Sequence, residues 1–242
     1  MLNHFREEGM IEGGDYCFID LKCIVGKMAR KKQIRNQEYK ELANCFTREQ
    51  NHAGKWKEIF GNDHPITLEL GCGKAEFSLE LARRYPDQNY IGIDLKPDRM
   101  WNAASKALEE GLHNIKFLWI NLNSISTHFT PDEVAHIWIT FPDPYPKNRQ
   151  AKHRMINPAF LKQYKTIMRP DGRLWFKTDS LELFHYSLEV FVAQSDVVLK
   201  ELSFDLHESE KIHEDAMIKT SYEKIFLRMG KTINYLSLEF LP

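Results

Sequence analysis

The chain has 242 residues, 43% of them hydrophobic, and a formal net charge of −1. This length suits one large domain, or one domain with an appendage, and the hydrophobic fraction excludes a disordered chain. No apolar run approaches the roughly 20 residues that span a bilayer, and the acidic start is no secretory signal, so we expect a cytoplasmic protein without membrane contact. Because the net charge is close to zero, any site for nucleic acid must be a local basic patch.

The N-terminal part of the chain divides into two segments. Residues 1–27 show little periodicity and precede a plausible initiator, Met28, so we expect a poorly ordered upstream extension. Residues 28–53 are expected to hold a basic arm and a helix from Asn36 to Phe46. The cations of the arm are Lys27, Arg30, Lys31, Lys32 and Arg35. Residues 54–242 then form the main domain.

From Ile66 onward, segments typical of strands and helices alternate. Strands are expected at Ile66–Leu70, Asn89–Asp94, Ile115–Ile120, Ala135–Phe141, Arg173–Lys177, Val197–Phe204 and Ile225–Met229. Helices are expected at residues 74–85, 97–110, 157–168 and 181–194, and a turn at residues 170–172. This alternation predicts a Rossmann-like α/β fold, with a mostly parallel, seven-stranded sheet and helices on both faces. Ligands of such sheets bind at the carboxyl ends of the strands.

A glycine-containing loop, Glu-Leu-Gly-Cys-Gly at residues 69–73, follows the first of these strands. Gly71 and Gly73 allow a tight turn and the close approach of a ligand to the backbone. The dinucleotide fingerprint requires a third glycine where this chain has Glu76. A carboxylate there opposes a pyrophosphate, so the loop favours S-adenosylmethionine over NAD or FAD. Taken alone, the loop is also compatible with a simple turn between strand and helix.

Polar residues at the ends of the next strands extend this candidate cofactor site. Asp94 ends the second strand, the usual place for a carboxylate that binds both ribose hydroxyls. Asn121 follows the third strand and is placed to meet the adenine edge. Glu69 would either orient the glycine loop or face the methionine ammonium group.

The sequence Phe-Pro-Asp-Pro-Tyr-Pro-Lys, at residues 141–147, follows the fourth strand. Its three prolines predict a rigid loop that presents one carboxylate, Asp143. A basic run follows directly, and we interpret its cations as contacts to RNA phosphates: Lys147, Arg149, Lys152 and Arg154. Asp143 could instead cap a turn, and the basic run could be an ordinary solvated face.

Together these motifs resemble the bacterial tRNA (guanine-N7-)-methyltransferases of the TrmB type. The resemblance covers about residues 54 to 230. It rests on Leu68–Lys74, Ile91–Asp94 and the 141–147 loop, followed by Lys-Thr-Asp at 177–179 and Thr-Ser-Tyr-Glu at 220–223. The chain departs from the family pattern at Tyr145, where Trp is commoner, at Asn121, where an acid is frequent, and at Asp94, where some members have Glu. These residues keep the ring or hydrogen-bonding character.

The resemblance implies roles for individual residues. Glu69, Asp94, Asn121 and Asp143 match positions that bind S-adenosyl-L-methionine, and Asp143 also matches the catalytic position. Substrate contacts are implied for Lys147, Asp179, Thr220, Ser221, Tyr222 and Glu223. Without the resemblance, Asp179 could serve as a helix cap, and Thr220 with Glu223 is typical of a capping box.

The implied reaction is methyl transfer to N7 of guanine 46 in the variable loop of tRNA. N7 carries a lone pair and no proton, so catalysis by positioning is expected, without a general base. Two alternatives remain: a methyltransferase for an exocyclic base amine, and a non-catalytic RNA-binding module. The former typically has two consecutive prolines after the Asn or Asp, which this chain lacks. We expect no metal, because cysteines and histidines lack metal-type spacing, and either a monomer or a homodimer.

Overall fold

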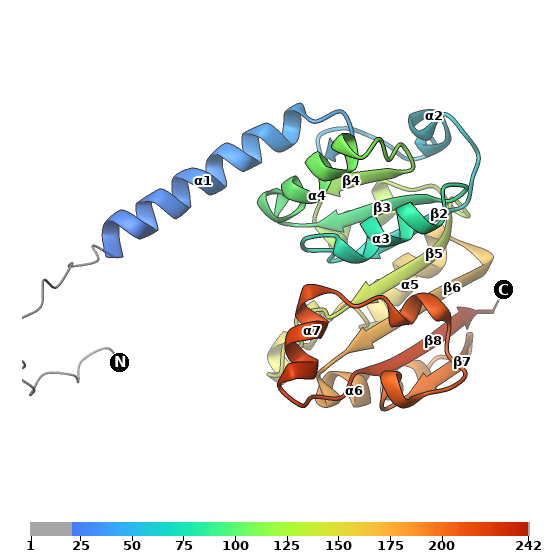
Figure 1. Ribbon diagram of the computed structural model, residues 1–242. Helices are drawn as coiled ribbons and strands as arrows, with labels where there is room; N and C mark the ends of the chain where they lie inside the picture. The colour runs from blue at the N-terminus through green and yellow to red at the C-terminus, as the bar shows by residue number, and fades with distance from the viewer. Residues whose placement is uncertain (1–20, 242) are drawn as a thin grey trace, which may run out of the picture.

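The computed structural model describes residues 21–241, whose strands form one eight-stranded sheet (Figure 1). The strands lie in the order β1-β4-β3-β2-β5-β6-β8-β7, and only β8 is antiparallel to its neighbours, β6 and β7. Their bounds are β1 Cys45–Thr47, β2 Ile66–Leu70, β3 Asn89–Asp94, β4 Ile115–Trp119, β5 Val134–Thr140, β6 Met168–Thr178, β7 Val197–Ser203 and β8 Asn234–Phe240. The predicted Rossmann-like class is confirmed, and β1 adds an eighth strand at one edge.

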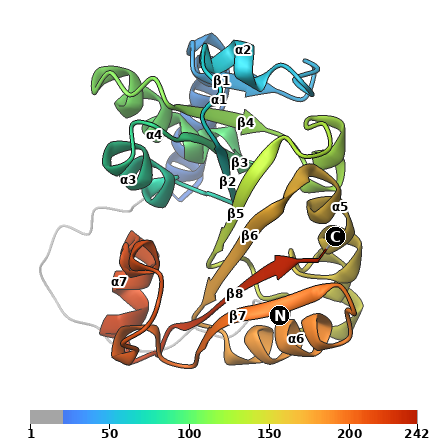
Figure 2. The same cartoon turned by 90° about the vertical axis from the view of Figure 1, so that its right-hand side faces the viewer.

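Helices cover both faces of the sheet. Figure 2 shows α3, α4 and α7 on one side and α5 and α6 on the other. The helices are α1 Leu21–Glu41, α2 Trp56–Phe60, α3 Glu76–Arg84, α4 Pro97–Glu109, α5 Pro158–Ile167, α6 Leu181–Val192 and α7 Ser221–Arg228. Short 3₁₀ turns are η1 Leu122–Thr127, η2 Asn148–His153, η3 Leu206–Glu208 and η4 Glu214–Met217. Within residues 21–241, no helix is long and apolar enough to cross a membrane.

The N-terminal helix, α1, differs from the expected segments. It includes Met28, so the predicted boundary between residues 27 and 28 falls inside a helix, and the prediction for residues 1–20 lies outside the described residues. The helix ends at Glu41, and the residues expected to complete it form β1 instead. The buried Tyr39 anchors the end of α1, while the first half of this helix extends away from the sheet (Figure 1).

Two other predicted elements were wrong. The segment Ile225–Met229 is not a strand: α7 includes it up to Arg228, and the last strand is β8. The Thr220 hydroxyl caps α7 by accepting from the Glu223 N–H, which favours the helix over an apolar strand. Residues 170–172 are not a free turn either. They belong to β6, where the pairing with β5 shifts between Val134 and His136.

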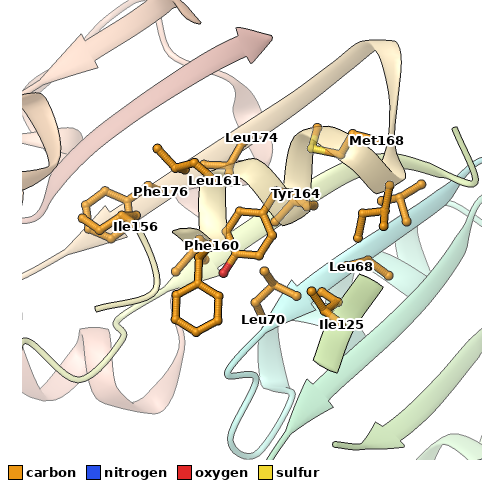
Figure 3. Close-up of a cluster of buried hydrophobic side chains, with 14 of the residues drawn as sticks. Leu68, Leu70, Ile125, Ile156, Phe160, Leu161, Tyr164, Met168, Leu174 and Phe176 are labelled. Atoms are coloured by element: carbon orange, nitrogen blue, oxygen red, sulfur yellow. The ribbon is translucent and has the colours of Figure 1, made fainter. Parts of the chain in front are cut away.

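The core lies on both faces of the sheet. On one face, Leu68 and Leu70 of β2 and Leu174 and Phe176 of β6 face Tyr164 of α5 (Figure 3). On the other face, the indoles of Trp138 and Trp175 stack with centroids 4.7 Å apart. Because β2 lies between β3 and β5, the strand order reverses at β2, and the loops after β2 and β5 begin side by side.

Candidate functional site

A cavity of about 820 Å³ opens at the carboxyl ends of β2, β3 and β5. Its volume lies in the range typical of small-molecule sites, roughly 300–1,000 Å³. All six residues predicted to bind the cofactor line it: Glu69, Gly71, Gly73, Asp94, Asn121 and Asp143. The structure therefore brings together side chains from four separate strand ends, as the sequence predicted.

The glycine loop lines this cavity, and every second residue from 71 to 75 is left-handed. The φ angles are +68° at Gly71, +55° at Gly73 and +49° at Ala75. A Cβ on Gly71 would lie 2.5 Å from Cε of Met155, so only glycine fits there without a shift of Met155. The Gly73 N–H donates to Oδ2 of Asp94 at 2.9 Å. The loop and the end of β3 are thus fixed to each other.

The Glu69 carboxylate ties three elements together beneath the loop. It accepts from the Ser78 N–H at 3.1 Å and the Ser78 hydroxyl at 2.5 Å, both on α3, and from the Thr140 hydroxyl of β5 at 2.8 Å. Burial raises the pKa of Glu69 to about 7, while these hydrogen bonds oppose the shift. Of its two expected roles, the contacts within the protein support orientation of the loop.

The other two polar residues are held by their own turns. Asp94 accepts from the Lys96 N–H through Oδ1 at 2.8 Å, and Asn121 caps η1 by accepting from the Asn123 N–H at 3.0 Å. Asn121 is exposed, and Asp94 is half-buried. Each therefore presents a polar side chain of fixed position to the cavity.

The loop at residues 141–147 contains unusual backbone conformations. Phe141 and Tyr145 are left-handed, with φ of +51° and +45°. Such conformations cost about 1–3 kcal/mol each in a residue other than glycine, and they concentrate at functional sites. The Phe141 N–H donates to the Lys177 carbonyl at 2.9 Å, which fixes the start of the loop to β6. Asp143 stands exposed between the two strained residues and lines the cavity.

Arg154 has a different place from the one the sequence suggested. Only 4% of it is exposed, and its guanidinium donates to the carbonyls of Pro144 at 3.2 Å and Tyr145 at 3.0 Å. It also lies over the Tyr186 ring, 4.2 Å from the centroid. Arg154 therefore supports the loop from within, and a phosphate contact does not fit this geometry. Lys147, Arg149 and Lys152 are exposed.

The residues of the 220–223 motif divide into two groups. Thr220 and Tyr222 line the cavity, whereas Ser221 donates its N–H and hydroxyl to Glu76 at 2.5 and 2.6 Å. Glu223 is fully buried. Its Oε2 accepts from Lys177 Nζ at 2.8 Å, and its Oε1 lies 2.9 Å from His207 Nε2. It is not among the residues that line the cavity. Its carboxylate thus holds α7 in place.

Sequence reasoning missed three parts of this arrangement. Lys177, the first residue of the Lys-Thr-Asp motif, is fully buried, and its Nζ also donates to the carbonyls of Ala216 at 3.0 Å and Ile218 at 2.7 Å. Phe226 lines the cavity from a segment expected to be a strand, and Glu76 binds Ser221. The available signal for the burial of Lys177 was its place at the end of the apolar run Leu-Trp-Phe, residues 174–176. Asp179 lines the cavity as expected, with Lys231 Nζ 2.5 Å from its Oδ2.

The chain matches a family model described as "Putative methyltransferase" over residues 63–236. It is 43% identical to a tRNA (guanine-N(7)-)-methyltransferase of Cytophaga hutchinsonii, over 89% of this chain and 100% of that protein. It is 37% identical to a protein of that name from Clostridium acetobutylicum, over 87% of this chain and 98% of the other. The chain belongs to the bacterial tRNA (guanine-N7-)-methyltransferase family. The resemblance found in its motifs is thereby confirmed.

Solved structures support the fold. The crystal structure of the 16S rRNA methyltransferase KamB aligns with a TM-score of 0.62 at 16% identity, over 80% of this chain and 96% of that chain. A 16S rRNA (adenine(1408)-N(1))-methyltransferase from Catenulisporales acidiphilia aligns with a TM-score of 0.57 at 12% identity, over 78% and 93%. At this identity the likeness establishes the shared methyltransferase fold and leaves the substrate to be argued from the site.

Proposed function

We propose that the chain transfers a methyl group from S-adenosyl-L-methionine to N7 of guanine 46 in the variable loop of tRNA. Methyl transfer to N7 of a tRNA guanine follows from membership of the family. The observation that carries the choice of site is the position of Asp143, which lines the same cavity as the glycine loop. Guanine 46 is the position that the resemblance implies.

The residues of the cavity fit S-adenosyl-L-methionine and oppose a dinucleotide. Glu76 is the first residue of α3, and its carboxylate accepts two hydrogen bonds from Ser221, so a negative charge already occupies that helix end. A pyrophosphate would meet this charge, whereas S-adenosyl-L-methionine has no phosphate. Gly71, Gly73, Asp94 and Asn121 would hold the cofactor, and Glu69 keeps their loop in place.

When bound, S-adenosyl-L-methionine supplies an electrophilic methyl group on a sulfonium, and its C–S bond breaks as the N7–C bond forms. The positive charge moves to the purine, and N7 has no proton to lose. The protein must therefore orient the guanine rather than deprotonate it. We assign Asp143 and Asp179, which both line the cavity, to accept from guanine N–H groups that become more acidic as the ring turns cationic. Such hydrogen bonds strengthen in the transition state.

The tRNA is held by cations around the mouth of the cavity. Lys147, Arg149 and Lys152 follow the loop directly and are exposed. Lys74, Lys96 and Arg99 line the cavity itself. We assign the first three to phosphate contacts, which position the RNA without reading its sequence. Lys147, Asp179, Thr220 and Tyr222 complete the substrate site, while Ser221 and Glu223 keep α7 in position.

The test is methylation of unmodified tRNA transcripts with labelled S-adenosyl-L-methionine, followed by borohydride and aniline treatment, which cleaves at N7-methylguanine. We expect incorporation and one cleavage at position 46, and neither in a transcript with adenine at that position. Cleavage elsewhere would move the target nucleotide. Label recovered on an exocyclic amine, or no incorporation into any tRNA, would overturn the proposed function.

A further inference from the structure

The side of α7 that points away from the protein carries an apolar stripe. Tyr222, Ile225 and Met229 are 51%, 48% and 65% exposed, and their spacing places them along one side of the helix. The opposite side holds Glu223, which is fully buried. We call Tyr222, Ile225 and Met229, with the neighbouring cations Lys224 and Arg228, the outer face of α7. Large exposed apolar side chains grouped in this way typically mark a contact surface.

A row of aromatic rings connects this face to the cavity. Phe141, in the loop that presents Asp143, lies 5.6 Å from the Phe226 ring. Phe226 stacks on Tyr222, with centroids 6.5 Å apart and an interplanar angle of 24°. All three rings line the cavity, and the last is half exposed at its mouth. Flat apolar surface therefore continues from the expected position of the guanine out to solvent.

The cations on α7 are free to meet an external anion. Lys224 and Arg228 are exposed, and among residues 21–241 neither has a carboxylate within 4.0 Å. On α3, by contrast, Arg83 binds Glu110 at 2.7 Å and Arg84 binds Glu80 at 2.9 Å. The outer face of α7 thus combines stacking surface with unneutralised positive charge, the combination with which proteins bind single-stranded nucleic acid.

We infer that the outer face of α7 binds the nucleotides on either side of the target guanine. This inference rests on the proposed function and extends it to residues beyond the cavity. A guanine that enters the cavity must leave its stack, so its neighbours lose a stacking partner. Tyr222, Ile225 and Met229 replace that partner, and Lys224 and Arg228 contact the adjoining phosphates. The occupant is therefore the RNA strand itself, not a second protein surface.

The test combines protein variants with altered RNA. The KM for methylation is measured with a tRNA transcript and with one carrying abasic residues on both sides of guanine 46. For the unaltered protein, loss of the neighbouring bases should raise KM by about tenfold. The variant Ile225→Ser/Met229→Ser should already have a raised KM, and the abasic transcript should raise it by less than twofold more. Affinity for S-adenosylhomocysteine should stay the same in both proteins.

A control variant tests whether the effect is specific to the outer face of α7 or follows from the loss of any exposed apolar side chains. Val192→Ser/Leu199→Ser alters side chains that are 86% and 43% exposed on α6 and β7. This variant should show the same rise in KM with the abasic transcript as the unaltered protein.

A second variant, Lys224→Gln/Arg228→Gln, tests the cations of this face. It should lower the log–log salt dependence of tRNA binding by about 0.7 for each lost phosphate contact.

Each outcome has a distinct meaning. An abasic penalty in Ile225→Ser/Met229→Ser equal to that of the unaltered protein would overturn the inference. So would loss of self-association in this variant with no change in KM, which would assign the face to a second copy of the chain. Methyl transfer by the unaltered protein distinguishes failure of this inference from failure of the proposed function. If the unaltered protein transfers no methyl group to tRNA, the proposed function fails, and the inference that rests on it fails too.

Discussion

At the scale of single residues, Asp143 combines exposure with a rigidly held backbone. The strained residues Phe141 and Tyr145 flank it, and their carbonyl and amide groups are bound by Arg154 and Lys177. This support fixes the backbone that carries the carboxylate. Preorganised charge of this kind acts where positive charge develops in the transition state.

Replacing Asp143 by asparagine should therefore lower turnover more than tRNA affinity. The variant keeps the shape of the side chain and loses its charge, and a hydrogen bond to a charged group contributes about 1.5–3 kcal/mol, or roughly tenfold to a hundredfold in kcat. The measurements are kcat and the Kd for tRNA. Asp132→Asn is the control, because Asp132 is an exposed loop aspartate like Asp143 but does not line the cavity. Full turnover by Asp143→Asn would remove the residue from the mechanism.

Glu69 should make the stability of the fold depend on pH. Its pKa is raised by burial from 4.5 to about 7, so the folded state holds the proton to higher pH than the unfolded chain does. The contribution of Glu69 is therefore complete below pH 4.5, is lost as the pH rises toward 7, and is constant above that. The full change is at most about 3 kcal/mol.

The variant Glu69→Gln tests this assignment. It should flatten the fall in the free energy of unfolding between pH 4.5 and 7, and urea titrations across that range measure it. Glu109→Gln, at an exposed position of α4, should leave the profile as it is. Profiles of the unaltered protein and Glu69→Gln that run parallel would show that the Glu69 carboxyl does not titrate differently in the folded state.

At the scale of elements, α7 is held at its first turn from two directions. Glu76 of α3 accepts from Ser221, and Glu223 pairs with Lys177 of β6 in a fully buried ion pair. Burial lowers the pKa of Lys177, and the Glu223 carboxylate opposes that shift. Because Thr220 and Tyr222 line the cavity from this turn, the two anchors hold this wall of the cavity in place.

Replacing one partner of the ion pair should lower the free energy of unfolding more than replacing both partners. Lys177→Met leaves the Glu223 carboxylate buried without its cation, and we expect a loss of about 3–5 kcal/mol in the free energy of unfolding. Lys177→Met/Glu223→Met should recover much of this loss, since apolar replacement of both partners is often close to neutral. Turnover should recover with stability, because the structure gives Glu223 a positioning role. Restored stability with turnover still absent would instead indicate direct contact between Glu223 and the substrate.

The elements that the sequence predicted well are those whose signals are local. The strands β2, β3 and β5 are short apolar runs. Asp94 ends β3 and Asp143 lies in the loop just after β5, so the cavity could be assembled from sequence order alone. The arrangement of α7 could not. Glu76 and Ser221 are 145 positions apart, and nothing in either segment indicates the other. Arg154 was misplaced for a similar reason: a basic run does not reveal which of its cations turns inward to the carbonyls of Tyr145.

At the scale of the whole molecule, charge is distributed unevenly although the net charge is only −1. Exposed cations without a carboxylate partner in residues 21–241 gather around the cavity, at Lys147, Arg149 and Lys152. The first half of α1 projects on the same side as the carboxyl ends of the parallel strands, whereas α2 lies toward the opposite ends (Figures 1 and 2). Arg30, Lys31 and Lys32 of α1 are exposed as well. A polyanion would therefore approach this side of the protein.

Neutralising two of these cations should weaken tRNA binding in a way that depends on salt. Arg149→Gln/Lys152→Gln should raise the KM for tRNA and reduce the log–log slope of affinity against salt by about 0.7–0.9 for each lost phosphate contact. Affinity for S-adenosyl-L-methionine should not change, because neither residue lines the cavity. Lys55→Gln/Lys57→Gln, which removes the same charge near α2, is the matched control and should keep the original slope. A slope in Arg149→Gln/Lys152→Gln equal to that of the control would place the basic run on an ordinary solvated face and leave the phosphate contacts to α1 and α7.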